Sequence, residues 1–87
     1  MYLIMVYDIA EERVYKVLKI ARKYLTWVQN SVLEGEISDA GFERLKMELK
    51  EIIEEDEDSV IFYTMRTTRY TSRENMGVVK GGDEQII

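Results

Sequence analysis

The stretch YLIMVYDI at residues 2–9 places six apolar or aromatic residues in an unbroken run before a single carboxylate, Asp8. A strand with one face in water alternates polar and apolar residues, so this run predicts a strand that is buried on both faces. A carboxylate is rarely buried without a partner. We therefore expect Asp8 to lie at the mouth of the sheet and to hold a metal ion.

The composition fits one small domain. The chain has 87 residues, of which 46% are hydrophobic, a fraction that argues against disorder. We expect a single domain over residues 1–80 and a tail over residues 81–87. No apolar run approaches the roughly 20 residues of a membrane span, and the start lacks the basic region of a signal peptide. The expected location is the cytoplasm.

The chain contains neither cysteine nor histidine. This absence excludes disulfides, thiolate nucleophiles, thiolate zinc sites, an imidazole base and histidine-ligated metals. Any chemistry must come from carboxylates, hydroxyls, basic side chains or a hard cation bound through oxygen.

The net charge of −5 is unevenly distributed. Residues 13–23 and 66–80 are rich in lysine and arginine, whereas acids concentrate in residues 51–58. This pattern is compatible with binding a polyanion on one side. It is equally typical of the solvated faces of a charge-rich thermophile protein.

The first half of the chain predicts a helix and then extended structure. Apolar residues at helical spacing predict a helix from about Glu11 to Leu25. Residues 8–11 also match a capping box, which would explain Asp8 as a helix cap without any function. Residues 27–37 read as extended, either as one kinked strand or as a tight pair.

The second half predicts a helix and two strands. Ser38 or Asp39 caps a helix whose end is the acidic run 54–58. Residues 59–66 form a nearly continuous apolar strand, and residues 67–75 read as a polar loop. Residues 76–80 predict a short final strand.

This order predicts an α+β fold, the ferredoxin-like βαββαβ sandwich with an added short C-terminal strand. Two helices cover only one face of such a sheet, yet its strands look apolar on both faces. We therefore expect a homodimer packed sheet to sheet, with the sheets about 10 Å apart.

A twofold dimer would supply a second copy of Asp8. Magnesium is commonly held by one or two carboxylates with waters and substrate phosphates, so the Asp8 pair is the expected catalytic and Mg²⁺-binding site of a phosphodiesterase. Tyr7, Ser31 or Thr64 could assist if they lie near. The candidate nucleic-acid contacts are basic residues that would bind the backbone without reading bases: Arg13, Lys16, Arg22, Arg66, Arg69 and Arg73.

Three stretches together resemble one family: residues 2–9, the VQNSVLEG stretch at 28–35, and the DSVIFY stretch at 58–63. At this spacing the chain looks like CRISPR-associated protein two, the small ferredoxin-like subunit of the spacer-acquisition machinery in antiviral defence. The resemblance covers residues 1–66 well and the last twenty weakly. The family often has a basic residue and a phenylalanine where this chain has Trp27 and Leu33.

The resemblance implies a homodimer whose C-terminal strand crosses to the partner's sheet edge, here through Met76, Val78 and Val79. It implies that Asp8 matches the family's metal-binding aspartate and Arg13 an arginine at the start of the first helix. It also implies an integrase whose dimers are bridged by this dimer while it holds duplex DNA. Family members are described as metal-dependent endonucleases acting on RNA or DNA.

Two other functions stay open. One is a toxin-type ribonuclease of similar fold that acts without an integrase. The other is a non-enzymatic, ligand-sensing dimer, which would need the second sheet face open to hold its ligand.

Overall fold

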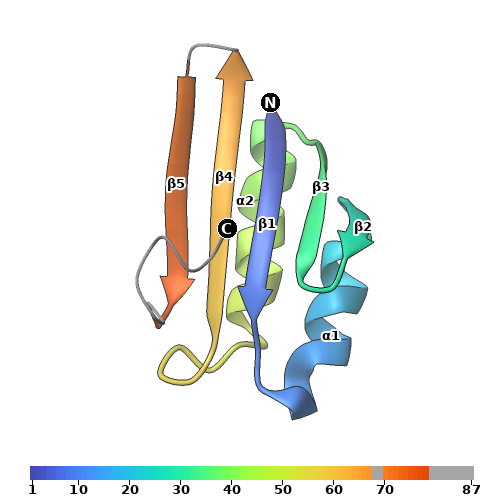
Figure 1. Cartoon of the computed structure of the whole chain (residues 1–87), viewed down its shortest axis with the longest axis vertical. Helices are drawn as coiled ribbons and strands as arrows, with labels where there is room; N and C mark the ends of the chain where they lie inside the picture. The colour runs from blue at the N-terminus through green and yellow to red at the C-terminus, as the bar shows by residue number, and fades with distance from the viewer. Residues whose placement is uncertain (68–69, 79–87) are drawn as a thin grey trace.

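The computed structural model describes residues 1–67 and 70–78 of the chain. Figure 1 shows a five-stranded antiparallel sheet in the order β2-β3-β1-β4-β5 with both helices on one side of it. The elements are β1 (Tyr2–Asp8), α1 (Glu11–Ala21), β2 (Thr26–Gln29), β3 (Val32–Glu36), α2 (Asp39–Lys50), β4 (Ser59–Thr67) and β5 (Tyr70–Gly77). The first four strands have the predicted ferredoxin-like arrangement, and β5 extends the sheet beside β4.

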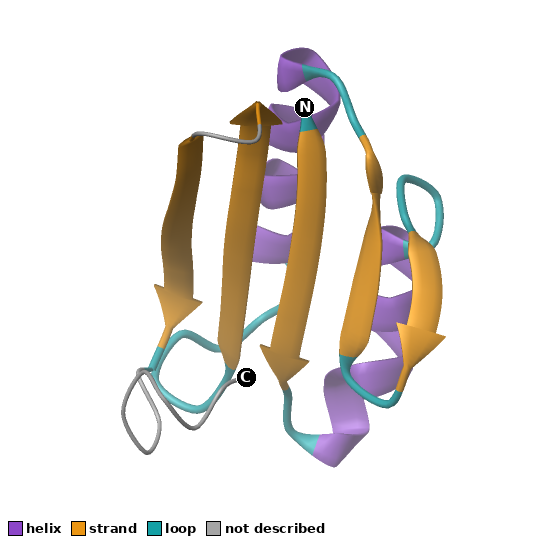
Figure 2. Ribbon diagram, turned by 45° about the horizontal axis from the view of Figure 1, so that its top comes forward, coloured by secondary structure: helices purple, strands orange, loops and turns teal. Residues whose placement is uncertain are grey.

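The core lies between the sheet and the helices. Leu3, Met5 and Tyr7 of the central strand β1 are buried toward the helices. Farther across the sheet, the ring of Phe62 packs edge-on against Phe42 of α2, with centroids 5.1 Å apart. This contact holds α2 against the sheet. The ribbon in Figure 2 shows α2 behind β1 and β4.

The second face of the sheet is apolar along β1 and β4, as expected for these strands, whereas β3 contributes Glu34 and Glu36 to it. Tyr2, Ile4 and Val6 alternate with the core residues of β1 and are half-buried. The register places Val6 opposite Ile61 and Ile4 opposite Tyr63 of β4. The helices leave the face that carries Ile4 and Val6 uncovered. A homodimer formed through this face stays a prediction.

The extended segment after α1 is a tight pair of strands. β2 and β3 are antiparallel, with a register shift between Trp27 and Gln29. Asn30 forms the turn with φ of +39°, a left-handed conformation that asparagine tolerates better than most residues. This hairpin decides between the two alternatives that the sequence left open.

The predicted helix boundaries need correction. α1 ends at Ala21, four residues earlier than expected. Its N-cap is Ala10, which makes no side-chain capping bond, so the predicted capping box around Asp8 is wrong. The predicted Ser38 cap of α2 is confirmed by its hydroxyl, which accepts a bond from Gly41 N. α2 ends at Lys50, so the acidic run lies in the connection to β4.

The prediction of a loop over residues 67–75 was also wrong. β5 spans most of that segment and pairs with β4 from Thr67–Tyr70 to Ser59–Gly77. Its polar residues misled the prediction because an edge strand needs backbone pairing on one side only. Of the short strand predicted at 76–80, Met76 and Gly77 belong to β5, and residues 79–80 lie outside the described part.

Among the described residues, no helix is both long and apolar enough to cross a membrane.

Candidate metal site and nucleic-acid interface

Asp8 is the exposed last residue of β1. It follows Tyr2, Ile4 and Val6 along the strand at two-residue spacing, so its side chain leaves the sheet on the face without helices. The register pairs Asp8 with Ser59 of β4, which in turn pairs with Gly77 of β5. Asp8 thus stands at the mouth of the sheet, where the sequence predicts it.

Oxygen-bearing side chains continue this edge across the neighbouring strands. The Ser59 hydroxyl donates to Asn75 Oδ1 at 3.3 Å, and Asn75 Nδ2 donates to the Gly77 carbonyl at 2.9 Å. These are hard donors of the kind that magnesium prefers. The chemistry of the donor set therefore fits Mg²⁺ with Asp8 as the charged ligand.

One chain does not complete such a site. Across residues 1–67 and 70–78, no group of three or more carboxylates is placed to hold a metal ion. A carboxylate from a second copy of the chain would raise the charge of the site, which is the arrangement predicted for the Asp8 pair.

The structure separates two of the suggested assisting residues from Asp8. Tyr7 points into the core, where its hydroxyl donates to the Asn30 carbonyl at 3.1 Å and burial raises the pKa of its phenol. Thr64 pairs with Leu3, toward the opposite end of β1. Ser31 lies at the same end as Asp8, and its carbonyl accepts from Tyr7 N at 3.0 Å.

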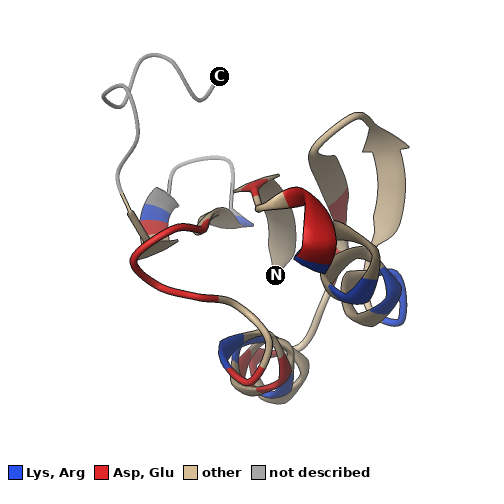
Figure 3. Cartoon of the chain, turned by 90° about the horizontal axis from the view of Figure 1, so that it is seen from below, with Lys and Arg blue, Asp and Glu red and all other residues tan. Residues whose placement is uncertain are grey.

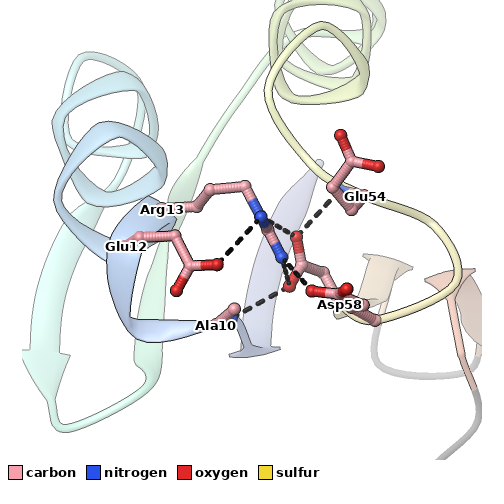
Figure 4. Close-up of polar contacts among 6 residues, drawn as sticks. Ala10, Glu12, Arg13, Glu54 and Asp58 are labelled. Atoms are coloured by element: carbon pink, nitrogen blue, oxygen red, sulfur yellow. Dashed lines mark hydrogen bonds and ion pairs between the residues drawn. The ribbon is translucent and has the colours of Figure 1, made fainter.

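Arg13 lies close to this end of the sheet, but its guanidinium already binds a carboxylate (Figure 4). Its Nε is 2.6 Å from Asp58 Oδ2, and its Nη2 is 2.9 Å from Asp58 Oδ1. Asp58 is fully buried and also accepts from the backbone N–H groups of Ala10 and Glu54, at 2.9 and 2.8 Å. The four bonds saturate the carboxylate, and the bond from Arg13 is the main cause that holds the pKa of Asp58 far below its usual range.

Sequence reasoning missed the role of Asp58. The sequence placed this residue in the acidic run before β4 and in the DSVIFY stretch of the family resemblance, with no sign that it would be buried. Arg13 also contacts the exposed Glu57, and its side chain is only 16% exposed. For Arg13 to bind a phosphate, as predicted, its guanidinium would have to share or leave these carboxylates.

The other predicted nucleic-acid contacts that the structure describes lie on separate parts of the chain. Lys16 is exposed on α1, and Arg22 is exposed at the C-cap of the same helix. Arg66 pairs with Asp39 at 3.0 Å, while Arg73 lies on β5, opposite Tyr63. Figure 3 shows basic segments on α1 and on β5 at separate sides of the molecule. Arg69 lies outside the described residues.

Comparison with known proteins decides the family. The family model described as CRISPR associated protein Cas2 matches residues 1–73. The chain belongs to the Cas2 family. It is 61% identical over 87 residues to a protein of Dictyoglomus turgidum and 59% identical to one of Thermotoga maritima, and each match covers both chains completely. Both relatives are named CRISPR-associated endoribonuclease Cas2.

Solved Cas2 structures share the fold. A crystal structure of Cas2 with 45% identity gives a TM-score of 0.74 and covers 100% of this chain and 98% of its own. A Streptococcus pyogenes Cas2 structure at pH 6.5 has 35% identity and a TM-score of 0.69, covering 75% of this chain and 86% of its own. These matches agree with the ferredoxin-like arrangement of the sheet and helices.

The predicted Cas2 strand exchange involves residues at the end of β5. In the single chain, Met76 pairs with Val60 of its own β4, and Val78 N donates to the Asp58 carbonyl at 2.9 Å. Val79 lies outside the described residues. Exchange of Met76, Val78 and Val79 with a partner stays a prediction.

Proposed function

We propose that this chain works as a homodimer in CRISPR adaptation and that the dimer is a magnesium-dependent endonuclease acting on RNA. The observation that carries the proposal is the position of Asp8. It is exposed, and it ends the same line of side chains as Ile4 and Val6 on the face that the helices leave uncovered. A dimer formed through that face would place two Asp8 carboxylates near one axis.

The chain's own groups define what such a site can do. The two Asp8 carboxylates would hold Mg²⁺, which supplies Lewis-acid polarisation of a phosphodiester and lowers the pKa of a bound water. Asn75 borders the site and is half-buried; one of its two amide N–H groups binds the Gly77 carbonyl, which leaves the other for a phosphate oxygen or a water. Because the chain has no histidine, proton transfer would rely on water or on carboxylates.

RNA is the favoured substrate because the most similar relatives reported above are named endoribonucleases. The resemblance also supports cleavage of DNA as an alternative. A cleavage assay run on both RNA and DNA measures which substrate is preferred.

A second role is scaffolding. The family resemblance supports a dimer that bridges integrase dimers and holds duplex DNA through its basic residues. This role needs the dimer and the basic surfaces but not the Asp8 chemistry. Integration assays with the integrase and the Asp8→Ala chain separate the two roles: integration without cleavage would show that Asp8 is dispensable for bridging.

Cleavage of a single-stranded RNA with magnesium or with EDTA tests the endonuclease. We expect Asp8→Asn to lower the rate on the order of 100-fold or more, the scale of losing a group that stabilises transition-state charge. Asp56→Asn, which changes an exposed acid in the connection to β4, should leave the rate unchanged. Equal rates for wild type and Asp8→Asn, or a rate unaffected by EDTA, would refute the proposed metal site.

A further inference from the structure

Trp27 is the only tryptophan of the chain and is 45% exposed on the edge strand β2. Its register partner is the core residue Leu33, so the indole projects on the helix side of the sheet and reaches the end of α1. This exposure leaves part of the indole accessible to a ligand.

The indole is held in place before any ligand arrives. Its Nε1 donates to the Asn30 carbonyl at 2.8 Å, and the Arg22 guanidinium lies over the ring at 5.8 Å from its centroid. A fixed aromatic ring loses little conformational entropy when a flat ligand stacks on it. Tryptophan beside arginine is the pairing that single-stranded nucleic-acid sites use for base stacking.

The adjoining face of α1 carries cations that the described residues leave without ion pairs. Arg22 also lines a shallow hollow of about 220 Å³ together with Tyr15, Leu18 and Lys19, which are spaced along one face of the helix. Among the described residues, no carboxylate forms an ion pair with Lys16, Lys19 or Arg22. In a chain with net charge −5, this local excess of positive charge is complementary to a polyanion.

In another hollow of the molecule, by contrast, the lining lysine is paired with acids. Between α2 and the edge strand β5, Lys46 is paired with both Glu43 and Glu74, at 3.2 and 3.3 Å. Its charge is neutralised within the chain, so that hollow offers no comparable attraction for phosphate. Lys46 and its surroundings therefore serve as an internal contrast to the α1–β2 surface.

We propose that Trp27, with Arg22 and Lys19, forms a binding site for single-stranded nucleic acid. A base would stack on the indole, and the two cations would contact the flanking phosphates. Tyr15, which is 74% exposed, offers a second ring farther along α1.

Trp27 and Asp8 lie on opposite faces of the sheet. Trp27 is two strands from β1 and level with Met5, which places its backbone roughly 10 Å across and roughly 10 Å along the sheet from Asp8. A nucleic-acid strand that reaches both would have to pass around an edge or end of the sheet. The inference thus rests on the proposed endonuclease for its role in substrate positioning, although stacking itself does not depend on cleavage.

Tryptophan fluorescence tests the inference directly because Trp27 is the only tryptophan of the chain. Oligo(U) is titrated in EDTA, with the wild type and with Asp8→Ala, so that cleavage plays no part. We expect quenching in both proteins and none with a blunt RNA duplex of the same length. A parallel titration with oligo(dT) distinguishes RNA from DNA as the source of the stacked base.

Variants give the magnitude through filter binding or anisotropy of labelled oligo(U). Trp27→Ala should weaken binding about 10-fold, the scale of one lost base-stacking contact, and Trp27→Phe should restore most of it. Arg22→Gln and Lys19→Gln should each weaken binding and reduce its salt dependence, whereas the matched change Lys46→Gln should do neither.

Unchanged affinity in Trp27→Ala, or no quenching by oligo(U), would overturn the inference even if RNA cleavage persists. Emission that changes only with protein concentration, or only when a protein partner is added, would also overturn it and would assign the β2 edge to a protein contact. Quenching that survives in Asp8→Ala supports the inference whatever the cleavage assay shows.

Discussion

Arg13 and Asp58 bind each other through two pairs of atoms, with Nε–Oδ2 at 2.6 Å and Nη2–Oδ1 at 2.9 Å. The pair ties the first turn of α1 to the residue that precedes β4 (Figure 4). The next residue, Ser59, pairs with Asp8 at the end of β1. Asp58 also bonds the backbone of Ala10 and Glu54. A buried carboxylate in the α2–β4 connection therefore ties that connection to the β1–α1 connection and to the first turn of α1.

Removal of Asp58 should destabilise the fold strongly. Asp58→Ala leaves the Arg13 guanidinium and two backbone N–H groups without their acceptor, so we expect a loss of about 3 kcal/mol or more in the free energy of unfolding. Urea unfolding measures it. The matched control is Glu57→Gln, which changes a contact of the same arginine at an exposed position and should cost less than about 1 kcal/mol. Equal effects of the two changes would contradict a structural role for Asp58.

The same carboxylate predicts how stability depends on pH. The pKa of Asp58 is lowered in the folded state from an ordinary value of 3.8, mainly by the bond from Arg13. Its contribution is therefore present at pH values above 3.8 and is lost as the pH falls below this value toward the folded pKa. Urea unfolding of the wild type from neutral pH to pH 2 should show this loss.

Asp58→Asn supplies the comparison for that titration. Lys23 lowers the pKa of Glu48, which adds a loss of the same sign, so the difference between wild type and Asp58→Asn isolates Asp58. The difference should shrink as the pH falls below 3.8. A difference that stays constant through this range would argue against the lowered pKa.

Gly77 should resist substitution because of its backbone. Its φ is +98°, and a Cβ there would overlap the carbonyl oxygen of Asp58. Gly77→Ala should cost more than about 1 kcal/mol of unfolding free energy. At Gly35, by contrast, an added Cβ would make ordinary contacts with Leu25 at 3.7 Å, so Gly35→Ala should be close to neutral. Similar thermal unfolding of the two variants would show that β5 does not approach Asp58 in this way.

The uncovered sheet face should carry the dimer contact. Ile4→Glu places a charge among half-buried apolar residues there, so we expect it to yield monomers that keep their far-UV circular dichroism. Sedimentation equilibrium measures the molar mass. Met47→Glu, at a site on α2 that is 68% exposed, should leave the dimer intact. A dimeric Ile4→Glu would place the interface elsewhere.

The sequence was sufficient for the parts of the fold that depend on hydrophobic pattern. The apolar runs at residues 2–7 and 59–65 predicted the two central strands, and the Ser38 cap set the start of α2. Pattern failed where a strand gains stability from pairing at an edge, as β5 does with its polar residues. It also failed at the start of α1, where it predicted a cap from Asp8. The carboxylate that accepts from the backbone N–H of Ala10 belongs to Asp58, 48 residues along the chain.

In the candidate site, too, local features could be predicted from the sequence and tertiary contacts could not. The place of Asp8 follows from its position at the end of an apolar strand, which is a local property of the chain. The engagement of Arg13 could not be predicted because it depends on a tertiary contact with one acid among the several of residues 51–58. Trp27 could be singled out by sequence only as a departure from the family pattern, whereas its exposure and its contact with Arg22 needed the structure.

The central claim is that two Asp8 carboxylates from two chains form one cleavage site. It is tested most directly by RNA cleavage with magnesium as wild-type chain is exchanged into dimers with increasing amounts of Asp8→Asn chain. If both carboxylates are needed, the rate should fall with the square of the wild-type fraction, to about a quarter when half the subunits are wild type. A rate that falls linearly, or does not fall, would contradict the shared site.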